Sequence, residues 1–296
     1  MAATAAQASL ELLDRARATT GEGPLWDAAR GVLWWVDIPA GLVHRFDPRR
    51  GPDVPLDVGA AVGAVALRRD GTLLAALADS LAVLDPADGR LATLLPFLPA
   101  DPALRCNDGK VDPAGRFWIG RLDRAEAAGA GTLLRVGADG SVTTCLAGLT
   151  VPNGLDWSPD GGTMYYVDSA WGEVRRYDFD PLHGTMTREA SLVRFPADGG
   201  VPDGLTVDAE GCLWVAWWGM GRIERVSPGG EHLESIELPV SQVASCAFGG
   251  DDLDQLYVTT AREGLTAERL RAEPLAGALF RCRPGVRGRP PTLFAG

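Results

Sequence analysis

The residues best suited to chemistry in this sequence are oxygen-bearing side chains that stand just before a glycine in a repeated phrase. The phrase VPNGLDWSPDGG at Val151–Gly162 returns as VPDGLTVDAEG at Val201–Gly211, where Asp203 takes the place of Asn153. Glu22 stands before a glycine in the related phrase GEGP. Carboxylates that are brought together repel one another unless a cation lies between them. The phrase therefore predicts a cation site, provided that the fold brings these positions together.

The donor set indicates which ions would bind. Carboxylate and amide oxygens are hard ligands that suit Ca²⁺, Mg²⁺ or Mn²⁺, and Zn²⁺ also accepts carboxylates. None of the three histidines lies in these phrases, which disfavours the usual zinc-hydrolase ligand set. We expect one divalent ion, with Ca²⁺, Zn²⁺, Mn²⁺, Mg²⁺ and Fe²⁺ as the candidates. The alternative is that these are ordinary turn residues, because Asn-Gly and Asp-Gly pairs are common in turns.

A repeat that covers most of the chain must position these residues. Six segments share one plan, in which a short apolar run is followed by an acidic turn and a second apolar run. Asp-Gly between such runs is a strong hairpin signal, and a period of 40 to 50 residues is typical of four-stranded propeller blades. We predict an all-β fold, a six-bladed β-propeller around a central channel, as a single domain over residues 1–296. The glycines that open the first five units are Gly23, Gly63, Gly109, Gly154 and Gly204.

In each predicted blade, the residue before the marked glycine begins the innermost strand and therefore faces the channel. Glu22, Asp108, Asn153 and Asp203 occupy this position in blades one, three, four and five, whereas blade two has Val62. The fold thus accepts an apolar residue here and does not require an oxygen donor. The repeat accounts for the position, and a ligand function accounts for the residue type.

The ends of the chain carry three further predictions. Leu10–Ala16, within an N-terminal segment of residues 1–17, is expected to pair with the last blade and close the ring. Pro291–Ala295 is read as a strand, and Leu265–Glu273 as a short helical piece inside the last unit.

Composition excludes several function classes. The net charge of −11 and the absence of any run of five basic residues argue against nucleic acid or a membrane surface as a partner. There is also no apolar run of transmembrane length and no signal-peptide pattern. The five cysteines are an odd number without a C-x-x-C pair, which indicates reduced thiols. We expect a cytoplasmic protein that is a monomer or a weak dimer.

Several motifs in order resemble the senescence marker protein-30, gluconolactonase and regucalcin family of six-bladed propeller lactonases. The resemblance spans roughly residues 18 to 282, and the motifs are specific in combination although each alone is weak. They are Gly21–Pro24, Arg105–Asp112, Pro152–Leu155, Pro202–Gly204, Thr260–Leu265 and Pro274–Gly277.

The resemblance implies roles for particular residues. Glu22, Asn153 and Asp203 match the positions that bind one divalent metal in the family, and Arg105 and Asn107 match those that hold the sugar lactone. The implied reaction opens an aldonolactone, such as gluconolactone or xylonolactone, to the sugar acid. The metal would polarise the lactone carbonyl for attack by water. Asp203 would be both ligand and general base, or the water would arrive already activated by the metal.

One departure concerns the sugar contact. Animal members have an acidic residue soon after the third-blade strand, and here that stretch reads GRLDRA over residues 120–125, so Asp123 is taken as the stand-in. Trp217 and Trp218 either wall the substrate pocket or pack between blades.

Other functions remain compatible with the same residues. No Ser-His-Asp pattern is apparent, so covalent acyl transfer is not favoured. A phosphotriesterase or broad esterase on this scaffold is the second choice among enzymes. A divalent-metal-binding regulatory protein without turnover, or a propeller that serves as a protein-interaction module, are the non-enzymatic alternatives.

Overall fold

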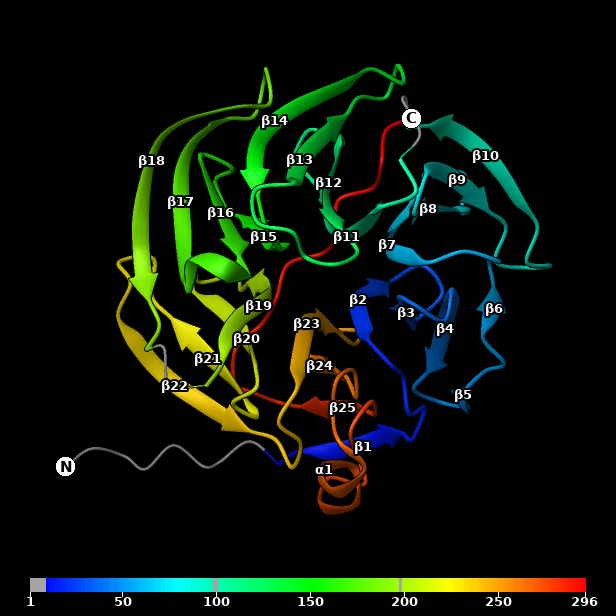
Figure 1. The fold of residues 1–296 in the computed structure, drawn as a ribbon, viewed down its shortest axis with the longest axis vertical. Coiled ribbons are helices and arrows are strands. Elements are labelled where there is room, and N and C mark those ends of the chain that lie inside the picture. The colour runs from blue at the N-terminus through cyan, green and yellow to red at the C-terminus, as the bar shows by residue number, and fades with distance from the viewer. Residues whose placement is uncertain (1–8, 98–100, 197–198) are drawn as a thin grey trace.

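The computed structural model describes residues 9–97, 101–196 and 199–296 as a ring of six antiparallel sheets around a central channel (Figure 1). The prediction of an all-β, six-bladed propeller is therefore confirmed. The strands β2, β7, β11, β15, β19 and β23 lie nearest the centre, and successive strands of each blade lie further out (Figure 1).

Each blade is built from strands that are consecutive in sequence, except the last. The first three blades are β2 (Gly21–Asp27), β3 (Val32–Asp37), β4 (Leu42–Asp47), β5 (Gly51–Pro52) and β6 (Leu56–Asp57); β7 (Val62–Leu67), β8 (Leu73–Leu77), β9 (Ser80–Leu84) and β10 (Leu91–Pro96); and β11 (Leu104–Val111), β12 (Phe117–Asp123), β13 (Gly131–Val136) and β14 (Val142–Leu149). The others are β15 (Pro152–Trp157), β16 (Thr163–Asp168), β17 (Glu173–Asp180) and β18 (Thr185–Arg194); β19 (Val201–Val207), β20 (Leu213–Trp218), β21 (Arg222–Val226) and β22 (His232–Glu237); and β23 (Val243–Gly249), β24 (Gln255–Thr260), β25 (Leu279–Cys282) and β1 (Glu11–Asp14).

The sixth blade joins the two ends of the repeat region. Its outermost strand is β1, which pairs antiparallel with β25 so that Leu12 lies opposite Phe280. The Arg281 guanidinium also contacts the Glu11 carboxylate at 2.6 Å. One short α-helix, α1 (Ala267–Ala272), lies between β24 and β25, within the predicted helical piece. The Thr266 hydroxyl caps it by accepting a hydrogen bond from the backbone N–H of Arg269.

Buried aspartates tie the hairpins to the core in alternate blades. In blade three, Asp112 Oδ2 accepts hydrogen bonds from Trp118 Nε1 at 3.0 Å and from Arg116 Nε at 2.6 Å. Several charge-assisted donors on one buried carboxylate make such a group structural. Asp112 therefore holds its blade together. The matching pairs in blades one and five are Asp27–Trp34 at 3.3 Å and Asp208–Trp214 at 3.0 Å.

The C-terminal segment after β25 crosses the molecule beneath the inner strands (Figure 1). The prediction of a strand over Pro291–Ala295 is wrong, because only an isolated bridge joins Arg68 and Phe294 there. Consecutive prolines at 290 and 291 supply no N–H groups for a sheet ladder. The segment is anchored instead by single backbone hydrogen bonds, from Phe294 to Leu67 and from Ala295 to Gly115.

We expect the Phe294→Ala substitution to lower the free energy of unfolding by about 3 kcal/mol. Phe294 is only 2% exposed and packs in a core cluster shared by blades two and three. Its removal leaves a cavity between them. Urea unfolding measures the change, and Leu293→Ala, at a side chain 39% exposed, is the control that should cost less than about 0.5 kcal/mol. Equal losses in the two variants would contradict the anchoring role of Phe294.

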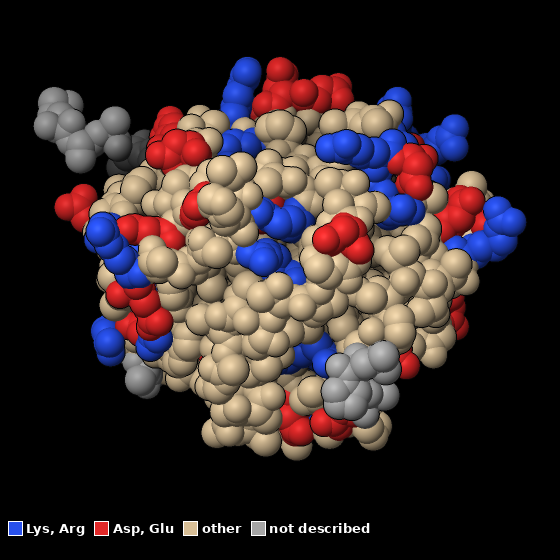
Figure 2. Space-filling view, turned by 90° about the horizontal axis from the view of Figure 1, so that it is seen from above, with Lys and Arg blue, Asp and Glu red and all other residues tan. Residues whose placement is uncertain are grey.

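Figure 2 shows the ring from its outer edge, where acidic and basic side chains are interspersed. Among the described residues, no helix is long and apolar enough to cross a membrane. All five cysteines are free, as the sequence predicted from their spacing.

Candidate metal centre and active site

The innermost strands are irregular where the predicted ligands lie. The register of β2 against β3 shifts between Glu22 and Leu25, and β15 and β19 shift at the equivalent places, after Pro152 and after Pro202. Such bulges free backbone groups from the ladder and re-aim side chains. Asn153 and Asp203 lie within the shifts of their strands, and Glu22 is the last residue in register before the shift in β2, so each predicted ligand lies at a bulge.

A pocket lies at the end of the channel where these innermost strands begin. Five of the six residues predicted for the site line it: Glu22, Arg105, Asn107, Asn153 and Asp203. Thr20, Ser169, Trp218 and Glu263 also line it. The fold therefore brings Glu22 and Asp203 into one pocket although they lie 181 positions apart in the sequence.

Asp123 is not among the described residues that line this pocket. Its Oδ1 accepts a hydrogen bond from the backbone N–H of Ala125 at 2.8 Å, so the carboxylate caps its own turn. The turn continues into Glu126, whose φ of 54° is left-handed, and Glu126 does line the pocket. The acidic residue that this loop contributes to the pocket lining is therefore Glu126, three residues after the predicted one.

The pocket carboxylates are buried in a way that disfavours their charged forms. Glu22 and Asp203 are 5% and 4% exposed. Burial, with the nearby Asp108 carboxylate, raises the pKa of Glu22 to about 8. Burial, with the charges of Glu22 and Asp108, raises the pKa of Asp203 well above its usual value. A cation among these groups would reverse both shifts.

Asp203 provides the observation that tests whether a cation fits. Its Oδ1 is buried and has no hydrogen-bond partner among the described residues, a costly arrangement for a carboxylate. The Asp203 and Glu22 carboxylates and the Asn153 amide offer oxygen donors to the same pocket, and none of them is a soft ligand. The residues present therefore fit a divalent ion with oxygen ligands.

A chain of side-chain hydrogen bonds fixes the pocket's amides. Arg105 Nη1 donates to Asn107 Oδ1 at 2.6 Å, and Asn107 Nδ2 donates to the Pro152 carbonyl at 2.9 Å. Asn107 Nδ2 also lies 3.3 Å from Asn153 Oδ1. Asn153 Nδ2 in turn donates to Ser169 Oγ at 3.0 Å. Asn107 therefore links the pocket's arginine to a predicted metal ligand.

The two tryptophans have different places. Trp218 lines the pocket, whereas Trp217 is fully buried and packs edge-on against Phe195, with ring centroids 4.8 Å apart. Alternation along β20 points adjacent side chains to opposite faces, so one of the pair walls the pocket and the other packs in the core.

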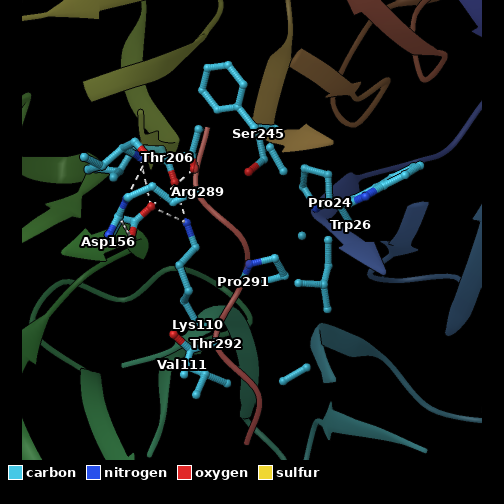
Figure 3. A pocket seen from close by; sticks show the side chains of 18 of the residues that line it. Pro24, Trp26, Lys110, Val111, Asp156, Thr206, Ser245, Arg289, Pro291 and Thr292 are labelled. Atoms are coloured by element: carbon cyan, nitrogen blue, oxygen red, sulfur yellow. Dashed lines mark hydrogen bonds and ion pairs between the residues drawn. The ribbon is translucent and has the colours of Figure 1, made fainter. Parts of the chain in front are cut away.

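The opposite end of the channel is crossed by the C-terminal segment (Figure 3). Arg289 Nη2 donates to Asp156 Oδ1 at 3.1 Å and to the Trp157 carbonyl at 2.6 Å. Lys110 Nζ lies 3.2 Å from Asp156 Oδ2, so the two cations share one carboxylate. Lys110 thus links β11 to β15 through Asp156, and Arg289 attaches the C-terminal segment to the same carboxylate.

A second group of ligand-type residues lies in the first hairpin of blade five. Ligand atoms of Asp208, Glu210 and Cys212 lie within 4.8 Å of one another. However, Arg225 Nη2 already contacts Asp208 Oδ2 at 2.8 Å and Glu210 Oε2 at 2.6 Å. Burial also raises the pKa of the Cys212 thiol, which keeps it protonated. We assign no metal to this group, because a guanidinium takes the cation's place.

Comparison with known proteins adds a family to this geometry. The model of the SMP-30/gluconolactonase/LRE-like region matches residues 20–262. The chain belongs to this family. The match contains every pocket residue named above except Glu263, and it confirms the resemblance seen in the sequence.

Individual relatives of the family cover nearly the whole chain. A 6-deoxy-6-sulfogluconolactonase of Pseudomonas putida is 38% identical over 289 residues, covering 97% of this chain and 99% of the relative. Regucalcin of Xenopus laevis is 36% identical over 283 residues, covering 93% and 95%.

Two solved structures share the fold closely. A calcium-binding protein, regucalcin, from Agrobacterium tumefaciens superposes with a TM-score of 0.92 at 33% identity, covering 97% of each chain. A luciferin-regenerating enzyme superposes with a TM-score of 0.90 at 30% identity, covering 96% of this chain and 98% of that one.

Proposed function

We propose that this protein is a metal-dependent lactonase that opens a sugar lactone, such as gluconolactone or xylonolactone, to the sugar acid. The observation that carries the proposal is the unpartnered Asp203 Oδ1, buried in a pocket that also holds Glu22, Asn153 and Arg105. Family membership and the sulfogluconolactonase relative support lactone hydrolysis as the reaction class.

Glu22, Asn153 and Asp203 are the residues proposed to hold the ion. Bound there, a divalent ion supplies Lewis acidity toward a carbonyl oxygen. The oxygen-only donor set favours Ca²⁺, Mg²⁺ or Mn²⁺ over ions that prefer nitrogen or sulfur, with Zn²⁺ and Fe²⁺ as further candidates. The description of the Agrobacterium relative as calcium-binding supports Ca²⁺ as the first ion to test.

The pocket's own residues supply the remaining chemistry. Asp203 Oδ1 is placed to take a proton from the attacking water, whose oxygen bonds to the lactone carbonyl carbon. The C–O bond of the ring then breaks, and the ring oxygen takes up the proton that Asp203 accepted and leaves as a hydroxyl group. Arg105 is partly committed to Asn107 and to the Cys106 carbonyl, and its other N–H groups are available to lactone oxygens. Arg105 therefore orients the substrate and stabilises negative charge on oxygen.

The rim of the pocket supports a polyhydroxylated substrate. Glu126 and Glu263 line it from different blades, and their carboxylates accept hydrogen bonds from hydroxyl groups. Glu263 also accepts from the Thr20 hydroxyl, which holds it beside the pocket. We propose Glu126, in place of Asp123, as the sugar contact of the third blade.

Glu126→Ala is expected to raise KM for gluconolactone about tenfold and to leave kcat within about twofold of wild type. A hydrogen bond to a charged group contributes about 1.5 kcal/mol or more, and one made equally in ground and transition states affects KM alone. Steady-state kinetics with spontaneous hydrolysis subtracted would measure it, beside Asp123→Ala as the matched variant. If Asp123→Ala carried the larger KM effect, the assignment would revert to Asp123.

A second candidate is a divalent-metal-binding protein without useful turnover. The names of the regucalcin relatives and the calcium-binding description favour it. In either case we propose a monomer or weak dimer in the cytoplasm, which the five free cysteines support.

Acid release from glucono-1,5-lactone and xylonolactone by chelator-stripped protein separates these functions. Each divalent ion is added back in turn, and the spontaneous rate is subtracted. Activity that is lost on chelation and restored by one ion supports the lactonase. Tight ion binding with no rate above background for any lactone supports the binding protein.

A further inference from the structure

Ser169 is one of the residues that line the pocket, and it lies where the fourth and fifth blades meet. It begins the 3₁₀ turn η1 (Ser169–Trp171), directly after β16, and is 7% exposed. The turn is held by Asp168, whose carboxylate accepts hydrogen bonds from the backbone N–H groups of Thr150, Val151 and Ala170. The position of the Ser169 hydroxyl is therefore fixed by the backbone around it.

The polarity of the Ser169 hydrogen bonds leaves one arrangement. Ser169 Oγ lies 2.8 Å from the Pro202 carbonyl, which can only accept, so the single hydroxyl hydrogen points there. Ser169 Oγ must then accept from its other partner, Asn153, at 3.0 Å. The Asn153 nitrogen thus faces Ser169, and the Asn153 oxygen faces away from it. These hydrogen bonds therefore distinguish Nδ2 of Asn153 from Oδ1.

The same hydroxyl reaches two ligand-bearing bulges. The Pro202 carbonyl belongs to the residue before Asp203, and it is free to accept because the ladder between β19 and β20 is interrupted there. Ser169 therefore connects the Asn153 amide of blade four to the backbone of the Asp203 bulge in blade five.

We propose that Ser169 is a positioning residue for the metal site: it fixes the Asn153 amide with its oxygen toward the ion and ties that amide to the Asp203 bulge. The inference rests on the proposed metal function of Asn153 and Asp203. Without the Ser169 acceptor, only the 3.3 Å contact from Asn107 Nδ2 orients the amide, and rotation about its last side-chain torsion presents N–H groups to a cation. Partners that orient a ligand typically change metal affinity 10–100-fold when removed.

The test compares metal affinity in two backgrounds. Calorimetric titration of the chelator-stripped, full-length protein with Ca²⁺ and with Mn²⁺ gives the dissociation constants. We expect Ser169→Ala to raise Kd by 10–100-fold. In the Asn153→Asp background the ligand is a carboxylate with two equivalent oxygens, so it presents an oxygen to the ion in either orientation. There, adding Ser169→Ala should change Kd by less than about threefold. The coupling between the two substitutions isolates orientation from general loosening.

Ser191→Ala is the matched control, because it also removes a hydroxyl from blade four. Ser191 lies on the outer strand β18, and its hydroxyl donates to Glu173 at 2.7 Å. Its Kd should equal that of wild type. If Ser169→Ala weakens binding equally in both backgrounds, its effect is merely structural and the positioning role is overturned. If wild type binds and Ser169→Ala binds as tightly, the inference fails while the proposed function stands. If wild type binds neither ion, the proposed metal site itself fails.

Discussion

Asp203→Ala is expected to reduce kcat/KM for gluconolactone by at least about 10³-fold, since we propose this one side chain as both metal ligand and proton acceptor. General-base assistance alone contributes about 10²–10⁴-fold, and the ion's contribution is lost with its ligand. The measurement is initial-rate acid release at a saturating concentration of the activating ion, with the metal content of the variant determined in parallel.

Asp139→Ala is the control for this variant. Asp139 caps an exposed hairpin of blade three by accepting from the Ser141 N–H, and it is not among the described residues that line the pocket. Its activity should remain within about twofold of wild type. An Asp203→Ala protein that kept more than a tenth of wild-type activity would remove Asp203 from both assigned roles.

Removal of the metal is expected to make the protein's stability fall as the pH rises from about 4.5 to about 8. The folded-state pKa of Glu22 is about 8, above its ordinary value of 4.5, and that of Asp203 is raised as well. Between the unfolded and folded pKa values the native state holds more protons than the unfolded state, so the free energy of unfolding decreases with pH. The penalty is absent below about pH 4, where both states are protonated.

A bound divalent ion removes this penalty by taking the protons' place. Metal binding should therefore release protons, and the rise in Tm on adding the ion should grow between pH 5 and pH 8. At an ion concentration of 100 Kd the stabilisation is about 2.7 kcal/mol. Thermal melts of stripped and loaded protein across this range provide the measurement, with Glu22→Gln as the control that should flatten the dependence. A Tm shift that is the same at every pH would contradict the assignment of these carboxylates as ligands.

The fold was readable from the sequence because the repeat signals agree with one another. Asp-Gly turns between short apolar runs recur at blade spacing, and Val62 shows that the ligand position is not demanded by the architecture. The predicted strand at Pro291–Ala295 is wrong because burial alone does not make a strand. Phe294 is buried, but an isolated bridge holds it instead of a ladder of hydrogen bonds.

The pocket residues that the sequence predicts come from two sources: the repeat indicates Glu22, Asn153 and Asp203, and the family resemblance adds Arg105 and Asn107. Glu22, Asn153 and Asp203 share a register position, so their convergence follows from the ring. Glu126 and Ser169 lie instead in turns between strands, and no periodicity fixes where such residues point. Glu126 has a left-handed φ, which usually occurs at glycine or asparagine, so the sequence does not predict this turn. The sequence therefore favours Asp123 over Glu126.

The pairing of β1 with β25 determines when the ring can close during synthesis of the chain. Blades one to five are each built from strands that are neighbours in sequence, whereas the sixth pairs Leu279–Cys282 with β1, which precedes all the other blades. The hydrogen bond from Thr20 to Glu263 likewise joins residues on either side of the first five blades. We therefore expect the ring to stay open, and the pocket incomplete, until Leu279–Cys282 has been synthesised.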